Sequence, residues 1–294
     1  MKNKPLFSVI IPTYNRASLI PFTLNSVLEQ TFFDFEVIII DDGSTDNTTE
    51  IIQPYLADRR VYYYKIKNSE RSAARNYGVQ KSAGRYVTFL DSDDLFLPWH
   101  LKTAHQKIEE TNSAPIFHLA YEILHSNGHT DQLPELPSPV NEKLLEGNFL
   151  SCIGVFLQRD VALENRFDEN LSRSEDYELW MRIASRMPIL IFNEVTSRLI
   201  NHNERSVSTT DIKKLIEQSS SVSQKLTADP FFIKRFGNKT GKFNSFRILY
   251  LSLHLAISGE RWRATKGLLH TLYLYPYVMF TYRFIVVCKK IILW

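Results

Sequence analysis

The chain of 294 residues has only two cysteines, ten glycines and a net charge of +3. Cys152 and Cys288 make neither a disulfide framework nor a zinc knuckle, so a reducing cytosol fits best. The small net charge gives no argument for a nucleic-acid partner. The apolar run from Phe7 to Ile11 is interrupted at once by Pro12, so we expect no signal peptide and no export.

Glycine is missing where two classes of nucleotide-binding protein need it. Residues 12–16 contain none, whereas a dinucleotide dehydrogenase needs Gly-x-Gly-x-x-Gly after its first strand. A nucleotidyltransferase would be expected to carry an early glycine-rich loop with a lysine, and this motif is also absent. With 44% hydrophobic and 23% charged residues, the chain is nevertheless an ordinary globular one.

Strand and helix signals alternate over the first 110 residues. Short apolar runs predict strands at 7–11, 37–40, 61–66 and 86–90, and helical spacing predicts helices at 18–31, 46–55, 70–82 and 98–110. Ser18 is the expected N-cap of the first helix. This alternation predicts an α/β fold, with a Rossmann-like, mostly parallel sheet and helices on both faces. Ligands of such sheets bind beyond the carboxyl ends of the strands, where polar clusters stand at 13–16, 41–42 and 91–94.

The remainder of the chain is less regular and then becomes helical. We expect a strand at 116–124, a type I′ turn at Asn127-Gly128, a strand at 154–157, a helix at 175–186 capped by Ser174, and a closing hairpin of 189–192 and 195–200. Helices are predicted at 212–226, 244–258, 260–275 and 277–293. The sequence therefore predicts one domain over residues 1–208 and a helical C-terminal region over 209–294.

Acidic residues at two strand ends are candidate ligand groups. Asp91 and Asp93 could turn toward one Mg²⁺ or Mn²⁺, which keeps positions open for substrate phosphates. The alternative is a solvated acidic turn, in which Asp94 serves as a local helper. Asp41 and Asp42 could accept hydrogen bonds from a nucleobase or ribose, or could simply form the turn that Asp-Gly-Ser favours.

Three arginines, Arg71, Arg75 and Arg85, lie near the strand ends and could pair with a diphosphate, although a single surface arginine is usually only solvated.

Glu175 and Asp176 begin a helix, where acids complement the macrodipole. Alternatively, one of them is a general base for an acceptor hydroxyl. Adjacent helix positions point about 100° apart, so only one can face the acceptor. His202 could be a metal ligand or touch a diphosphate, or it could be structural.

Together these motifs resemble the family-2 glycosyltransferases of the glycosyltransferase A-type fold. The resemblance covers about residues 6–208 and rests on an ordered set of segments: 8–16, 37–46, 72–76, 84–87, 90–94, 175–176 and 202–208. It implies donor-binding roles for Pro12, Tyr14, Asn15, Asp42, Arg71, Arg75, Asp91 and Ser92. It further implies metal ligation by Asp91, Asp93 and His202, acceptor binding by Glu175 and base catalysis by Asp176.

The resemblance also implies an activity. The expected reaction is inverting transfer of a sugar from a nucleotide-diphosphate donor, most simply a UDP-sugar, to a hydroxyl of a saccharide or lipid-linked saccharide. Mn²⁺ or Mg²⁺ would be the cofactor, and cell-surface polysaccharide or glycolipid synthesis the setting. The alternative from another class is an inactive sugar- or nucleotide-binding scaffold of the same fold.

The C-terminal segment from Leu272 to Cys288 is apolar and aromatic, except for Arg283. It is shorter than the roughly 20 apolar residues that a spanning helix needs. Tyrosines beside Lys289 and Lys290 suggest peripheral contact with the inner face of the cytoplasmic membrane by an otherwise cytoplasmic protein. The alternative is a helical subdomain that packs on the first domain or on a second subunit of a homodimer.

Overall fold

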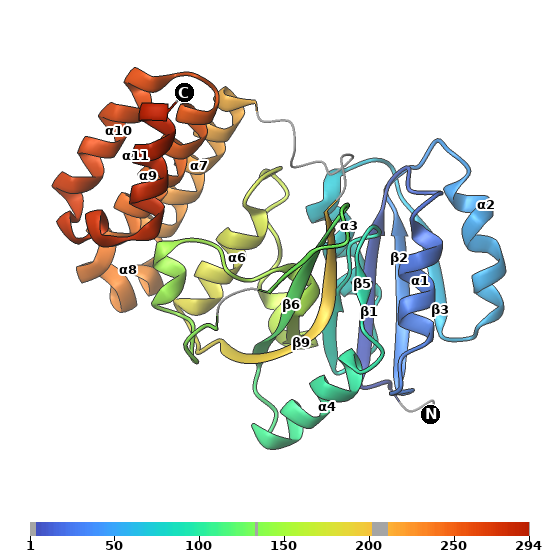
Figure 1. Ribbon diagram of the computed structural model, residues 1–294. Helices are drawn as coiled ribbons and strands as arrows, with labels where there is room; N and C mark the ends of the chain where they lie inside the picture. The colour runs from blue at the N-terminus through green and yellow to red at the C-terminus, as the bar shows by residue number, and fades with distance from the viewer. Residues whose placement is uncertain (1–3, 133–134, 202–210, 294) are drawn as a thin grey trace. The chain divides into compact units, whose positions relative to one another are not determined.

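The computed structural model describes residues 4–132, 135–201 and 211–293, and they divide into two compact units (Figure 1). The first unit contains the sheet and comprises residues 1–140, 150–176 and 188–205. The second is helical and comprises residues 206–294 together with Asn141–Phe149 and Tyr177–Met187. Our predicted division near residue 208 lies beside the last of these boundaries. We did not predict that residues 141–149 and 177–187 belong to the helical unit, because each segment is too short to show a change in composition.

Half of the sheet is parallel. Its strands are β1 (Phe7–Thr13), β2 (Phe35–Asp41), β3 (Val61–Lys65) and β4 (Tyr86–Phe89), in the spatial order β3-β2-β1-β4. Helices α1 (Ile20–Leu28), α2 (Thr48–Ile52) and α3 (Glu70–Lys81) connect them. Every residue of β1 and β2 is buried, as expected for parallel strands covered on both faces. The predicted elements are present, but Leu19 rather than Ser18 is the N-cap of α1.

The other half of the sheet is mixed. Beyond β4 follow β8 (Val155–Gln158), β6 (Ile116–His125), β9 (Leu190–Asn201) and β5 (Leu95–Phe96), while β7 (Thr130–Gln132) pairs with the free part of β6. β8 is antiparallel to β4 and β6, and β9 is parallel to β6. Helices α4 (His100–Glu110) and α5 (Arg159–Glu164) belong to this half. The predicted α/β fold class with a helical C-terminal region is confirmed.

Two local predictions in this half are wrong. The predicted hairpin of 189–192 and 195–200 is instead the single strand β9. Its register passes from Phe192 opposite Leu119 to Val195 opposite Ala120 and skips two polar residues as a bulge. The turn between β6 and β7 is not type I′, since Gly128 has φ of +81° but Asn127 does not have a positive φ. The Gly128 amide donates to the carbonyl of His125, as in a three-residue loop with a glycine bulge.

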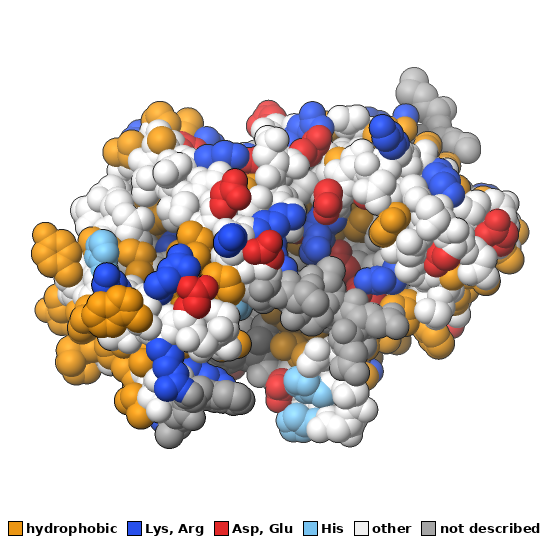
Figure 2. Space-filling view, turned by 90° about the horizontal axis from the view of Figure 1, so that it is seen from above, with side chains coloured by type: hydrophobic (Ala, Val, Ile, Leu, Met, Phe, Trp, Pro, Cys, Tyr) orange, Lys and Arg blue, Asp and Glu red, His pale blue; other side chains and the backbone are white. Residues whose placement is uncertain are grey.

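The helical unit contains the end of α6 (Glu175–Ala184) and the helices after residue 210. These are α7 (Ile212–Ala228), α8 (Pro230–Phe236), α9 (Thr240–Ile257), α10 (Arg261–Leu274), the 3-10 helix η5 (Pro276–Phe280) and α11 (Tyr282–Leu293). Phe232, Phe236 and Phe243 pack edge to face in its interior. Hydrophobic side chains also lie on its surface (Figure 2). Among the described residues, none of the helices combines the length and hydropathy that crossing a bilayer requires.

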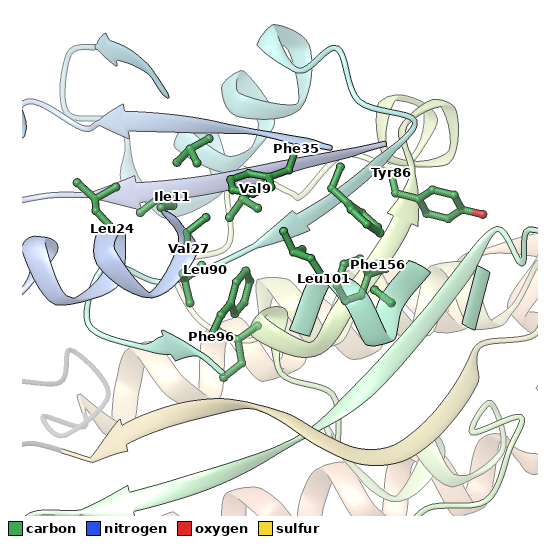
Figure 3. Packing of buried hydrophobic residues seen from close by; sticks show 14 of the residues in the cluster. Val9, Ile11, Leu24, Val27, Phe35, Tyr86, Leu90, Phe96, Leu101 and Phe156 are labelled. Atoms are coloured by element: carbon green, nitrogen blue, oxygen red, sulfur yellow. The ribbon is translucent and has the colours of Figure 1, made fainter. Parts of the chain in front are cut away.

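The core of the sheet unit follows from the alternation of side chains along β1. Val9 and Ile11 point to the face covered by Leu24 and Val27 of α1 (Figure 3). Ile10 points to the opposite face, where α3 packs closely. A Cβ on Gly78 of α3 would lie 2.4 Å from Cγ2 of Ile10, so only glycine permits this approach.

Two fully buried histidines lie in this unit. His100 of α4 stacks on Phe96 with ring centroids 3.8 Å apart, and its Nδ1 lies 2.8 Å from Oγ1 of Thr196. Burial, together with the neighbouring His118, lowers the pKa of His100 to about 3. Burial likewise lowers the pKa of His118 on β6 to about 3. Both imidazoles are therefore neutral in the folded protein near neutral pH.

We predict that these histidines destabilise the protein in acid. The unfolded chain takes up their protons near pH 6.5, whereas the folded protein does so only near pH 3. The free energy of unfolding should therefore fall as pH decreases from about 6.5, each histidine contributing up to about 1.4 kcal/mol per pH unit. Urea unfolding between pH 7 and 4 measures this slope.

His118→Asn should flatten the slope by one proton, whatever it does to stability at pH 7. The exposed His270 provides the control, because His270→Asn should leave the slope unchanged. An unaltered slope in His118→Asn would contradict the assignment.

Candidate active site

The polar clusters of the sequence lie at the carboxyl edge of the parallel strands. Thr13, Asp41 and Phe89 are the last residues of β1, β2 and β4, which are neighbours in the sheet. Because parallel strands end at the same edge, the loops that follow them lie together. Pro12 is buried in β1 opposite Ile40, while Tyr14 in the first loop is 44% exposed.

Asn15 fixes the loop after β1 to the loop after β2. Its backbone has φ of +50°, a conformation that asparagine tolerates better than most residues. Its side-chain Oδ1 accepts a hydrogen bond from the backbone amide of Thr45 at 2.8 Å. Its backbone amide donates a hydrogen bond to Oγ of Ser44 at 3.0 Å. The side chain predicted to bind the donor therefore also organises the loop around it.

The two aspartates after β2 differ in their surroundings. Asp41 is completely buried and accepts hydrogen bonds from the amide of Ser44 at 2.7 Å and from the hydroxyl of Tyr63 at 2.5 Å. Burial and this bond to Asp41 raise the pKa of Tyr63 to about 12. Asp41 is thus a turn residue, which is the second of the two roles that the sequence allowed for it.

Asp42 accepts a hydrogen bond from the amide of Ser69 at 2.8 Å, just before α3 begins. Burial raises the pKa of Asp42, against the opposing effect of this bond and a second one from the Glu70 amide. A buried carboxylate beside a loop is a suitable fixed acceptor for a nucleobase, which is the role predicted for Asp42.

The acidic cluster after β4 has an outer and an inner part. The side chains of Asp91 and Asp93 are 32% and 12% exposed. Ser92 is buried between them. Asp94 is also buried, and its Oδ1 accepts the amide of Ile200 at 2.9 Å, so it is a local helper as expected.

Arg75 joins this acidic cluster to the start of α6. One guanidinium nitrogen donates to Oδ1 of Asp91 at 2.7 Å, and another donates to Oε1 of Glu175 at 3.1 Å. Arg71 lies one turn earlier on α3, with Nε 3.8 Å from the same Glu175 oxygen. Burial disfavours the charge of Arg75, yet nearby negative groups including Asp91 and Glu175 outweigh it and raise its pKa well above the usual value.

This arrangement does not fit the acceptor-binding role predicted for Glu175. We expected it to contact an acceptor, but it is 4% exposed and its carboxylate is occupied by Arg75 and Arg71. Asp176 follows it and is more accessible. Of the adjacent acids, Asp176 is therefore the one whose position suits the predicted base, and Glu175 holds the helix start against α3.

Sequence reasoning gave no role to Arg16. Its Nε lies 3.9 Å from Oδ2 of Asp93, and its amide donates to Oγ1 of Thr48. The sequence did offer one indication of this contact, because Arg16 is a cationic residue after the first strand and the metal-binding carboxylates were expected at the same edge of the sheet. His202, the third predicted metal ligand, lies outside the described residues.

Three of the five described non-glycine residues with positive φ lie beside these residues, while the other two, Asn112 and Ser113, follow α4. Asn15, Glu70 and Ser174 have φ of +50°, +72° and +58°, although none is glycine. They precede Arg16, Arg71 and Glu175, respectively, and so stand beside three members of the ion-pair network. Such conformations persist where the surrounding structure imposes them, and they are common at functional sites.

The carboxylates offer a partial metal site. Within the described ranges, no three His, Cys, Asp or Glu side chains are grouped to hold a metal ion. Asp91 and Asp93 nevertheless supply hard oxygen atoms, and Mg²⁺ is commonly held by one or two carboxylates with water and substrate phosphates. The carboxylate oxygens of Asp91 and Asp93 are therefore suitable ligand atoms for a divalent cation.

Known proteins resemble the chain over most of this unit. Residues 8–164 match the family described as glycosyl transferase family 2. An uncharacterized glycosyltransferase of Rickettsia bellii is 38% identical over 183 residues, or 61% of this chain and 26% of that protein. The chain thus spans about a quarter of that relative's length.

Two relatives carry more specific names. The putative teichuronic acid biosynthesis glycosyltransferase TuaG of Bacillus subtilis is 32% identical over 187 residues, which cover 62% of this chain and 73% of TuaG. Chondroitin synthase of Escherichia coli is 32% identical over 222 residues, covering 73% of this chain and 31% of the synthase.

Solved structures extend the likeness over almost the whole chain. The crystal structure of S. aureus TarS 1-349 in complex with UDP-GlcNAc matches with a TM-score of 0.66 at 19% identity, covering 94% of this chain and 91% of that one. At this identity the match shows the shared fold. Because the family match covers more than half of the sequence of this chain, the chain belongs to glycosyl transferase family 2.

Proposed function

We propose that the protein is an inverting glycosyltransferase that transfers a sugar from a UDP-sugar to a hydroxyl of a saccharide or lipid-linked saccharide. The observation that carries this proposal is the bridge from Asp91 through Arg75 to Glu175, which links the donor edge of the sheet to the residue before Asp176. The named relatives support polysaccharide synthesis as the setting. The bound UDP-GlcNAc of TarS supports a uridine nucleotide as donor.

In the proposed reaction Asp176 takes the proton of the acceptor hydroxyl. The acceptor oxygen attacks the anomeric carbon and forms the new glycosidic bond as the bond from that carbon to the phosphate oxygen breaks. UDP leaves with the electron pair of the broken bond, and attack from the opposite side inverts the anomeric centre. Asp42 would accept a hydrogen bond from the uracil, while Pro12 and Tyr14 line the nucleoside pocket.

Charge on the leaving diphosphate must be balanced. Mn²⁺ or Mg²⁺, held by Asp91 and Asp93, would supply electrostatic stabilisation of this charge when bound. Arg71 is the more exposed of the two α3 arginines and is the candidate for a direct phosphate contact. Arg75 is a positioning residue in this scheme, because both its observed partners are protein carboxylates.

The first prediction separates sugar transfer from donor binding. Asp176→Asn keeps the shape of the side chain but cannot accept the proton, so turnover should fall about 10²–10⁴-fold, the usual contribution of a general base. UDP binding measured by calorimetry should stay within about twofold, because the base does not hold the nucleotide. Release of UDP from a panel of UDP-sugars, with acceptor saccharides and Mn²⁺, measures the turnover.

Asp160→Asn is the matched control. Asp160 is exposed on α5, which follows β8 at the opposite edge of the sheet, and its substitution should change neither quantity. Normal turnover by Asp176→Asn would remove this residue from the base role. UDP binding without any turnover in the wild-type protein would favour a binding protein instead.

The second prediction concerns the metal. Asp93→Ala should abolish the increase in UDP affinity that Mn²⁺ causes, since the cation loses a carboxylate ligand. Calorimetric titration of UDP with Mn²⁺ or with EDTA measures the increase. Asp94→Asn, which retains an oxygen that can accept the Ile200 amide, should keep the increase. An equal metal effect in Asp93→Ala and the wild type would exclude Asp93 as a ligand.

The third prediction concerns the bridge. Arg75→Met leaves the buried Glu175 carboxylate without its main cation and should cost about 3–5 kcal/mol of stability, the usual effect of breaking a buried pair. Arg75→Met combined with Glu175→Gln removes both charges and should recover most of the stability. Turnover should stay low in the double variant, because α6 is no longer tied to Asp91.

Denaturant unfolding and UDP release measure the two quantities. Arg71→Met is the control for stability, since its pair with Glu175 is longer and partly exposed, and it should cost less than about 1 kcal/mol. Recovery of turnover together with stability in the double variant would show that Arg75 does not position the site.

A further inference from the structure

Positive charge is concentrated at the C-terminal end of the chain. Residues 230–294 contain eleven Lys and Arg but a single acidic residue, Glu260. The remaining 24 Lys and Arg and 31 Asp and Glu belong to residues 1–229, which are therefore acidic overall. The small net charge of the whole protein conceals this separation.

The exposed face of α10 combines aromatic, aliphatic and basic side chains. Trp262, Leu269 and Tyr273 are 71%, 62% and 85% exposed, and exposed Lys266 lies among them. Their spacing of four, three and four residues places all four on one face of the helix. The ammonium group of Lys266 lies 5.0 Å from the centre of the Trp262 ring. The opposite face, with the buried Ala264 and Thr271, packs inside the helical unit.

The same pattern recurs on α11. Tyr282, Ile285 and Ile292 are 80%, 46% and 76% exposed, and exposed Lys289 stands between the last two. Spacings of three, four and three residues again define one face. Val287 lies on the other face, in an apolar cluster with residues of α9, α10 and η5. Between the two helices, Tyr277 and Phe280 of η5 are also exposed.

We propose that the exposed faces of α10, η5 and α11 dock on a bilayer surface that contains anionic lipids. Aromatic side chains favour the headgroup region, and lysines among them would neutralise lipid phosphates. Residues 261–294 include no acidic residue, so α10, η5 and α11 themselves carry no acidic side chain that would repel such lipids. Figure 2 shows hydrophobic side chains over the helical unit, with Lys and Arg and some Asp and Glu side chains between them.

The charge pattern favours a membrane over a second copy of the chain. In a twofold dimer through this surface, the lysines of each copy would meet the same surface of the other copy, where residues 261–294 supply no carboxylate to pair with them. Burying unpaired like charges costs free energy, whereas an anionic bilayer supplies counter-charges. This inference does not depend on the proposed sugar transfer.

Sedimentation of the full chain with vesicles tests the proposal. One set contains phosphatidylcholine alone, and the other an equal mixture of phosphatidylcholine and phosphatidylglycerol. We expect the protein to bind the mixed vesicles and not the neutral ones, and to dissociate as salt increases. Lys266→Glu with Lys289→Glu should weaken binding about tenfold or more, given roughly 1 kcal/mol per basic residue.

A second variant, Trp262→Ala with Tyr273→Ala, should also weaken binding about tenfold through lost apolar contact. Lys102→Glu and Phe33→Ala are matched controls, because both residues are exposed on the sheet unit, and they should leave binding unchanged. Circular dichroism establishes that every variant is folded.

Three results would overturn the proposal. The first is absence of binding to both kinds of vesicle, and the second is equal binding by the charge-reversed and wild-type proteins. The third is a stable dimer in solution that the Trp262 and Tyr273 substitutions dissociate, since that would assign the surface to a second copy.

Discussion

The guanidinium group of Arg75 is the interaction on which the proposed site depends. It is 2% exposed, and it holds two carboxylates that are distant in sequence, Asp91 after β4 and Glu175 at the start of α6. Burying Arg75 and Glu175 costs several kcal/mol for each ion, whereas Asp91 stays partly exposed to water. Short charge-assisted hydrogen bonds in a fixed fork geometry offset that cost only if all three elements keep their places. The arrangement therefore selects one position of Asp91, α3 and Glu175 relative to one another within the sheet unit.

Two carboxylates around one arginine leave one negative charge, which Arg71 balances in number, but Asp42 and Asp176 add further carboxylates to the candidate site. Asp91 remains partly exposed while bound to Arg75, and Asp93 stands two residues on with Arg16 nearby. An edge with this charge attracts cations, and a diphosphate could approach it only together with positive charge. The network that orders these residues thus also sets the electrostatic conditions at the candidate site.

Much of the sheet unit could be predicted from the sequence, because its parallel strands are short apolar runs that end in polar turns. The strand over 190–201 could not, since its bulge at Asn193 and Glu194 has the composition of a turn. The sequence also predicted correctly that Asp42, Asp91 and Asp93 follow parallel strands at one edge of the sheet. No local pattern could reveal that Arg75 would hold Glu175, because that contact joins residues 100 positions apart.

One feature of α6 limits how this protein can be divided. The helix begins in the sheet unit with Glu175 and Asp176, but from Tyr177 to its end it belongs to the helical unit. There, Arg247 of α9 lies 4.9 Å from the centre of the Tyr177 ring. A chain ended at residue 208 would retain every residue assigned to the site, yet would lose the helices that complete the core around α6. A division of the protein at residue 208 would therefore separate α6 from the helices that pack around it, although α6 begins with two residues of the candidate site.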